Sequence, residues 1–334
     1  MQFIRVIAAL LFLCVVLPTH GQTPVDADDV IRVDTDLTNL LMTATDKQRR
    51  FITTLRAEDI KVLEDGTPQK LFTFERETNR PLALAFLIDI SSSEERTLPL
   101  EKRAARLFIE RVIKSTTDQA AIIPFTGSAF LEQPLTNNVL AIYRALERVD
   151  IALPSYTGSG LRLSGIASGP GLAAPPEDGT TAIWEAILLT SRDILQPLPP
   201  SRRRAIILLT DGHDTTSRIT RTEAVESVIG AESVIYAIGI GDSKEDGVNH
   251  GTLKDIAERT GGRAFFPKKE EDLNIAFAEI EQELRTQYLL AYSSSNKNRD
   301  GSYRKISVEI TNPDLLKEKV QLRHRPGYYA TSIH

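Results

Sequence analysis

An apolar run at residues 82–88 ends in a carboxylate followed by hydroxyl side chains, in the sequence DISSS that begins at Asp89. An uninterrupted apolar run of this length is typical of a buried strand. Buried strands do not usually end in several polar side chains unless a partner compensates these groups for the water they lose. The polar groups that follow this strand are therefore the first candidates for a binding site.

Two further segments supply oxygen donors at comparable positions. Asp211 closes the strand-like segment AIILLTD, and Thr180 and Thr181 precede a helical pattern. Ligands of open parallel sheets bind beyond the carboxyl ends of the strands, so we expect these groups to meet at one edge. Carboxylates and hydroxyls, with no thiol and no required imidazole, suit Mg²⁺, Mn²⁺ or Ca²⁺ rather than zinc or copper. The residue types therefore predict a site for a divalent cation.

The elements that must position these groups form an alternating pattern of strands and helices. Strands are expected at 82–89, 120–125, 205–211, 233–242 and 264–266, and helices near 98–114, 137–149, 181–195, 220–230, 251–260 and 270–286. Apolar strands separated by amphipathic helices favour an α/β fold, namely a Rossmann-like, mostly parallel sheet with helices on both faces.

The segments on either side of this region are rich in β pattern. Residues 29–45 alternate as in a half-buried strand, and Asp65-Gly66 separates two alternating runs as in a β-hairpin. The predicted buried face of the first strand comprises Ile31, Val33, Leu37 and Leu41. After residue 286, QYLLAYSSS, SYRKISVEI and EKVQLRH predict three more strands. Each flank is too small for an independent core, so we expect both to form one small β-sandwich into which the α/β domain is inserted; two separate β appendages are the alternative.

The beginning of the chain has the pattern of a secretory signal peptide. Arg5 precedes an uncharged apolar run of 12 residues, and small residues follow it. This run is short for a membrane span, although a retained anchor is the alternative. The predicted organisation is therefore a signal peptide at 1–21, a β-rich segment at 22–80, the α/β domain at 81–286 and a second β-rich segment at 287–331. We expect a secreted product, periplasmic or extracellular, with no membrane span after cleavage.

Composition and missing motifs exclude several function classes. The only cysteine lies in the predicted signal peptide, so the remaining chain must be stable through packing without disulfides. A net charge of −5 gives no electrostatic footprint for nucleic acid, and the basic clusters KQRR at 47 and SRRR at 201 are expected to be solvated turns. The sequence contains no G-x-S-x-G elbow, no G-x-G-x-x-G and no G-x-x-x-x-G-K-[ST] motif, so nothing indicates a serine hydrolase or a nucleotide-binding protein.

Three segments together resemble the metal-ion-dependent adhesion site of von Willebrand factor type A domains: DISSS at 89–93, GTTAIWEAI at 179–187 and LLTDGHD at 208–214. The resemblance implies a metal ligand set of Asp89, Ser91, Ser93, Thr181 and Asp211. Thr181 is preferred to Thr180 because it immediately precedes AIWEAI. Simple helix capping by these side chains is the alternative interpretation. Asp214 and the hydroxyl residues after it are expected to serve in a turn and in capping.

The wider sequence resembles exported bacterial proteins related to von Willebrand factor type A domains, including the Acidobacterial-type group. This resemblance rests on VLEDGTPQKLFTFER, TGGRAFFP, QYLLAY and RPGYYA. It implies a non-enzymatic adhesion or scaffold protein whose cation, Mg²⁺ before Mn²⁺ or Ca²⁺, binds a Glu or Asp of a protein partner. The alternatives are a module that the metal only stabilises and a metal-dependent hydrolase. The Gly- and Pro-rich segment 150–179 could determine the choice of partner or be a surface loop without a role.

Overall fold

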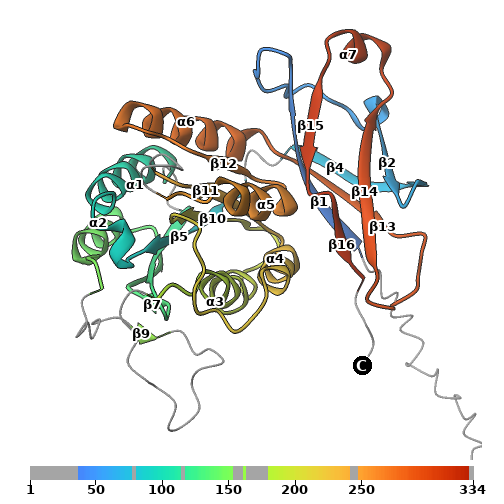
Figure 1. Ribbon diagram of the computed structural model, residues 1–334. Coiled ribbons are helices and arrows are strands. Elements are labelled where there is room, and N and C mark those ends of the chain that lie inside the picture. Colours follow the sequence, from blue (N-terminus) through green and yellow to red (C-terminus); the bar gives the residue numbers. More distant parts are fainter. Residues whose placement is uncertain are drawn as a thin grey trace, which may run out of the picture. The chain divides into compact units, whose positions relative to one another are not determined.

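A computed structural model of the chain describes residues 37–76, 80–113, 117–152, 161–162, 180–240 and 247–330, with only the backbone given for 161–162. The predicted signal peptide, Ile31 and Val33, and most of the segment 150–179 lie outside these ranges. The described chain consists of a β-sandwich and an α/β domain (Figure 1).

Two four-stranded antiparallel sheets make up the β-sandwich (Figure 1). The first has the order β15-β1-β13-β4, with β15 at Gln321–His324, β1 at Leu37–Thr45, β13 at Tyr288–Ser293 and β4 at Leu71–Arg76. The second has the order β16-β14-β2-β3, with β16 at Gly327–Tyr329, β14 at Tyr303–Ile310, β2 at Ile60–Glu64 and β3 at Thr67–Gln69. In each sheet, strands that precede the α/β domain pair with strands that follow it. Both flanks of the chain are therefore needed to build either sheet.

The hairpin predicted at Asp65-Gly66 connects β2 to β3. Asp65 and Gly66 both have positive φ, 50° and 81°, as the turn of a two-residue hairpin of type I′ requires. The hairpin is shorter than the sequence pattern indicates, because β4 leaves it and pairs with β13 in the other sheet. The segment 60–76, whose pattern predicts one long hairpin, therefore connects the two sheets.

Strand β1 is covered on both faces, and the predicted buried face of this strand is wrong. Its residues in the sandwich core are Leu40, Met42 and Ala44. Leu37 is 47% exposed, and Leu41 packs against the core of the α/β domain instead. Apolar residues on both sides of the strand made the alternating pattern ambiguous, because a shift of one residue exchanges the two faces.

A buried ion pair connects the strands of the sandwich. Glu64 on β2 accepts hydrogen bonds from the hydroxyls of Tyr292 and Tyr328 at 2.8 and 3.0 Å. Its carboxylate also lies 3.4 Å from the guanidinium of Arg304 on β14, and both charged side chains are at most 4% exposed. Since the partners of Glu64 belong to β13, β14 and β16, this network links the two flanks of the chain.

A six-stranded sheet with the order β12-β11-β10-β5-β6-β8 forms the α/β domain. Its strands are β12 at Arg263–Phe265, β11 at Ser233–Ile238, β10 at Arg203–Leu209, β5 at Leu82–Asp89, β6 at Gln119–Phe125 and β8 at Gln133–Thr136. Only the edge strand β8 is antiparallel to its neighbour among these described strands. Every residue of β5, β10 and β11 is buried, as expected for parallel strands that are covered on both faces.

Helices cover both faces of this sheet (Figure 1). On one face lie α1 at Leu98–Val112, α2 at Val139–Arg148 and α6 at Glu270–Thr286; on the other lie α3 at Ile183–Leu189, α4 at Arg221–Gly230 and α5 at His250–Thr260. Alternate residues of β5 belong to different cores, with Leu84 and Phe86 on the first face and Ala85 and Leu87 on the second. The predicted α/β fold class is confirmed.

A few short elements complete the described structure. They are β7 at Phe130–Leu131, β9 at Leu161–Arg162, α7 at Pro313–Lys317, the 3₁₀ turns Ala57–Asp59 and Ser92–Glu94, and a π-helical turn at Thr190–Leu195 that continues α3. Gly261 ends α5 in the left-handed conformation with φ 89°, the helix end expected from the Gly-Gly pair.

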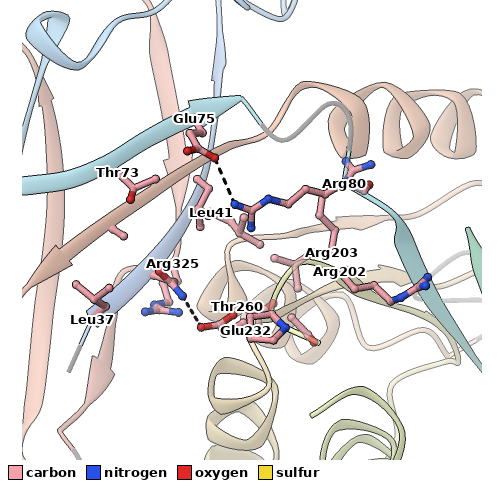
Figure 2. Close-up of a pocket in the computed structure, with 16 residues that line it drawn as sticks. Leu37, Leu41, Thr73, Glu75, Arg80, Arg202, Arg203, Glu232, Thr260 and Arg325 are labelled. Carbon is pink, nitrogen blue, oxygen red and sulfur yellow. Dashed lines mark hydrogen bonds and ion pairs between the residues drawn. The ribbon is translucent and has the colours of Figure 1, made fainter. Parts of the chain in front are cut away.

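The sandwich contacts the α/β domain at the amino ends of β10 and β11. A pocket of about 260 Å³ lies between the outer face of β1, β13 and β4 and these strand ends (Figure 2). Arg203 and Arg204, which the sequence predicts in a solvated turn, are instead buried here. Their guanidinium groups donate to the carbonyl oxygens of Arg80 at 3.1 Å and Ala231 at 2.8 Å. The solvated-turn interpretation of SRRR is therefore wrong, because its last two arginines bond to main-chain carbonyls beneath β10.

Replacing Glu64 by Ala should strongly destabilise the protein. The substitution leaves the buried Arg304 without its carboxylate, and the loss of one member of a buried pair costs about 3–5 kcal/mol. Glu75→Ala, which breaks an exposed pair with Arg80, should cost about 1 kcal/mol or less. Urea unfolding of the two variants measures both effects, and equal losses would refute the structural role of the Glu64 network.

Candidate metal site

The pairing of β5 with β10 places the ends of two distant segments beside each other. Ile88 lies opposite Leu209, so Asp89 and Thr210 are the next residues of their strands at the carboxyl edge of the sheet. The strand order reverses at this point, because the chain continues from β5 to β6 on one side and to β10 on the other. Open α/β sheets bind ligands at such switch points. The pocket of Figure 2, between the sandwich and the α/β domain, lies at the opposite, amino ends of β10 and β11.

Asp89 is the most deeply buried carboxylate at this edge, with 0% exposure. Its Oδ2 accepts a hydrogen bond of 2.6 Å from the Thr210 hydroxyl, and its Oδ1 accepts one of 2.9 Å from the backbone N–H of Ser91. Burial, together with the nearby charge of Glu94, raises the pKa of Asp89 to about 7. These hydrogen bonds orient the carboxylate but do not neutralise it.

Three carboxylates converge next to this position. Asp89, Glu94 and Asp211 each place one oxygen so that all three oxygens lie within 4.8 Å of one another. Like charges at this spacing repel, and a divalent cation among them would remove the repulsion. Carboxylate oxygens are also the ligands that Mg²⁺ and Ca²⁺ prefer. The residues at this edge therefore fit a hard divalent cation.

Asp211 lies on the loop after β10, and the neighbouring loops hold it in place. Its carboxylate accepts the backbone N–H of His213 at 2.9 Å, and its backbone carbonyl accepts that of Asn249 at 2.7 Å. The side chain is half-buried, whereas Asp89 is fully enclosed. The fold thus brings two of the predicted ligands together, with Asp89 buried and Asp211 nearer the surface.

The two predicted serine ligands follow Asp89 as the chain turns into a 3₁₀ turn. Their hydroxyl oxygens, on Ser91 and Ser93, lie 3.1 Å apart. Ser91 is buried and Ser93 is exposed, so the pair reaches from the Asp89 carboxylate towards the surface. No cap hydrogen bond from the side chain of Ser91 is present at this described turn, which removes the capping alternative for this residue.

The loop of Asp211 also holds Thr181. The backbone N–H of Thr181 donates to the Thr215 hydroxyl at 2.7 Å, and its carbonyl accepts the N–H of Thr215 at 2.8 Å. Asp214 caps α3 by accepting the N–H of Ile183 at 2.8 Å, which confirms the capping role predicted for Asp214. Within the described part of the chain the hydroxyl of Thr181 caps nothing, so it is free for another role.

Sequence reasoning missed two acidic residues at this edge, Glu94 and Glu101. Glu94 accepts a hydrogen bond from the Thr97 hydroxyl through Oε2, while its buried Oε1 has no partner among the described residues. Glu101 is buried on α1 and shares a hydrogen bond with Glu94, and burial raises the pKa of both carboxyls. A signal for each was present in the sequence. Glu94 directly follows DISSS, and Glu101 interrupts the apolar face of a helix.

The segment 150–179, which precedes Thr181, lies mostly outside the described residues. Its suggested role in partner choice therefore stays a prediction.

A family model matches part of the α/β domain. The model for the von Willebrand factor type A domain matches residues 172–282, which include Thr181 and Asp211 but not Asp89. The α/β part of this chain has the von Willebrand factor type A fold. Type A domains commonly bind proteins, often through a divalent cation.

Solved structures with similar folds have low sequence identity to this chain. BatB from Bacteroides thetaiotaomicron is 21% identical, with a TM-score of 0.44 over 60% of this chain and 98% of that protein. Proximal thread matrix protein 1 from the mussel byssus, in a structure with a zinc-occupied MIDAS motif, is 18% identical with a TM-score of 0.47 over 65% of this chain. This chain covers 48% of the mussel protein. A von Willebrand factor type A protein from Catenulispora acidiphila is 13% identical, with a TM-score of 0.46 over 84% and 75% of the two chains.

The fold assignment rests on the family match and on the observed sheet topology. No curated protein matches the chain in sequence. Among the helices that the structure describes, none combines the length and the apolar character needed to cross a bilayer.

Replacing Thr210 by Val should destabilise the metal-free protein at pH 8, where Asp89 is mostly ionised. The variant keeps the shape of the side chain but removes the donor to a buried carboxylate, and such hydrogen bonds contribute about 1.5–3 kcal/mol. Thr190→Val is the matched control, because the buried hydroxyl of Thr190 has no partner among the described residues and its loss should be neutral or stabilising. Denaturant unfolding in the presence of a chelator compares them, and similar effects for both variants would contradict the assigned role of Thr210.

Proposed function

We propose that this chain is an exported, non-enzymatic protein that binds a protein partner through a divalent cation. The proposed ligands are Asp89, Ser91, Ser93, Thr181 and Asp211. The observation that carries the proposal is the convergence of the Asp89 and Asp211 carboxylates, with a third carboxylate, within 4.8 Å at the switch point of the sheet. Mg²⁺ is the first choice, since all the donors are hard oxygens, and Mn²⁺ and Ca²⁺ are the alternatives.

Asp89 and the two serines have distinct tasks in this proposal. Asp89 supplies negative charge from beneath the edge, and Thr210 orients it. The serine hydroxyls extend the donor set towards the surface, where Ser93 is accessible to a partner. A bound cation would supply the positive charge that attracts a Glu or Asp side chain of the partner. The protein thereby recognises an acidic residue and needs no catalytic base.

The cellular location is part of the same proposal. The pattern at residues 1–21 and the resemblance to exported bacterial type A proteins of the Acidobacterial group both support secretion. Absence of cysteine after this segment is compatible with a β-sandwich stabilised by packing and by the Glu64 network. The partner would then be another exported or surface protein.

A second candidate function is a module in which the cation only stabilises the fold. The buried charge of Asp89 favours it, because the cation would relieve repulsion even without a partner. The two candidates differ in one property. A structural cation changes the free energy of unfolding only, whereas an adhesion cation also changes affinity for acidic ligands.

Calorimetric titration of the protein with Mg²⁺, Mn²⁺ and Ca²⁺ should show saturable binding that Asp89→Ala abolishes. The variant removes the buried carboxylate at the centre of the ligand set together with its repulsion of the buried Glu94, so it should fold normally. Circular dichroism checks the fold of both proteins. Cation affinity that is unchanged in folded Asp89→Ala would refute the ligand assignment.

Removing the cation should lower both the stability and the affinity for acidic peptides. A ligand at 100 times its Kd stabilises a protein by about 2.7 kcal/mol, so chelation should lower Tm measurably. Thermal unfolding with cation or chelator, beside titration of a Glu-containing peptide under both conditions, makes the comparison. A drop in Tm with no change in peptide affinity would favour the structural module.

A further inference from the structure

Glu94 is the one member of the carboxylate cluster that the adhesion-site pattern does not assign. It ends the 3₁₀ turn Ser92–Glu94, between β5 and α1. The side chain is 3% exposed, and one of its oxygens lies within 4.8 Å of oxygens of Asp89 and Asp211. Glu94 therefore lies inside the same cluster as two proposed ligands, although it was not among them.

The surroundings of Glu94 satisfy only part of its carboxylate. Oε2 accepts the hydroxyl of Thr97, and Glu101 beneath it shares a hydrogen bond with the Glu94 carboxyl. The backbone N–H of Asp211 is a further donor to this carboxyl, while the buried Oε1 has no donor at normal hydrogen-bond geometry among the described residues. An unsatisfied buried carboxylate oxygen is costly, and no purely structural role requires it. A cation in the cluster is the group that this oxygen lacks.

We propose that Glu94 is a third carboxylate of this chain at the cation, which strengthens cation binding and competes with the acidic side chain of a partner. The inference rests on the function proposed above and adds how the site regulates itself. Thr97 and Glu101 act as positioning residues, because both contact the Glu94 carboxyl rather than the other two carboxylates in the cluster.

Electrostatic repulsion places Glu94 in competition with an acidic side chain of a partner. Two carboxylates, Asp89 and Asp211, balance the charge of a divalent ion, and the ion then still attracts a third carboxylate. When Glu94 supplies that third carboxylate, the site has a net negative charge before any partner arrives. A partner must then displace or tolerate Glu94, so an isolated acid binds weakly. The matching partner is an acidic protein surface that makes further contacts around its Glu or Asp.

Glu94→Gln tests both parts of the proposal, because glutamine keeps the size of the side chain and removes its charge. Calorimetry measures the Mg²⁺ affinity first and then the affinity of the Mg²⁺-saturated protein for acetate. Mg²⁺ affinity should fall by about 10- to 100-fold, the range found when a group that supports a metal site is removed. Acetate affinity should rise several-fold. Glu95→Gln is the matched control, since it removes the same charge from the next residue, which is exposed, and should match the wild type in both titrations.

The outcomes separate this inference from the function on which it rests. If the wild type binds Mg²⁺, Asp89→Ala does not, and Glu94→Gln equals the wild type in both titrations, only the role of Glu94 is overturned. A loss of Mg²⁺ affinity in Glu94→Gln without a gain for acetate overturns the competition. If the folded wild type binds no cation, both proposals fail together.

A second variant covers the case in which Glu94→Gln does not fold. Glu94→Asp keeps the charge but withdraws the carboxylate by one methylene group. It should change both affinities in the same directions by a smaller factor, and wild-type values in both titrations would overturn the proposal.

Discussion

The parallel pairing of β5 with β10 is the constraint on which the arrangement at the sheet edge depends. Ile88 and Leu209 end two strands that are buried along their whole length, and the side chains that follow both strands must therefore emerge at the same place. Hydrophobic burial fixes this register, because alternate residues of the strands pack into two different cores. A shift of the pairing would disrupt the packing of both cores at once. The polar chemistry at the edge is thus positioned by apolar packing some distance below it.

The carboxylates at this edge lie at different depths below the surface. Asp89 lies below the surface, with an oriented hydroxyl beside it, while Asp211 and Ser93 lie where solvent or another molecule reaches them. A buried carboxylate needs a counter-charge more than an exposed one does, since little water reaches it. The difference in burial therefore gives the site an inner side and an outer side. Asp89 and Ser91 are enclosed by this chain, whereas Ser93 is accessible to other molecules.

Much of this structure could be predicted from the sequence, and the failures have identifiable causes. The strands of the α/β domain could be predicted from continuous apolar runs. The proximity of Asp89 and Asp211 could be predicted because both residues stand at the carboxyl ends of strands. The face of β1 was assigned wrongly because that strand is apolar on both sides. Arg203 and Arg204 were wrongly predicted to be solvated, because a run of charged residues does not show that buried carbonyl oxygens will accept hydrogen bonds from the guanidinium groups. Glu94 was missed because the adhesion-site pattern assigns no ligand role to the residue after DISSS, although Glu94 stands directly at that position.

The sharing of the sandwich between both flanks has a consequence for how the protein is made. During synthesis β1 and β2 emerge first, yet their neighbours β13 and β14 follow the entire α/β domain. The second sheet is complete only when Gly327–Tyr329 have been added, after the whole α/β domain. The α/β domain can therefore fold while the early strands still have unpaired edges, and such edges are prone to aggregation. Until β13 and β14 have been made, pairing of these edges with other chains competes with completion of the sandwich.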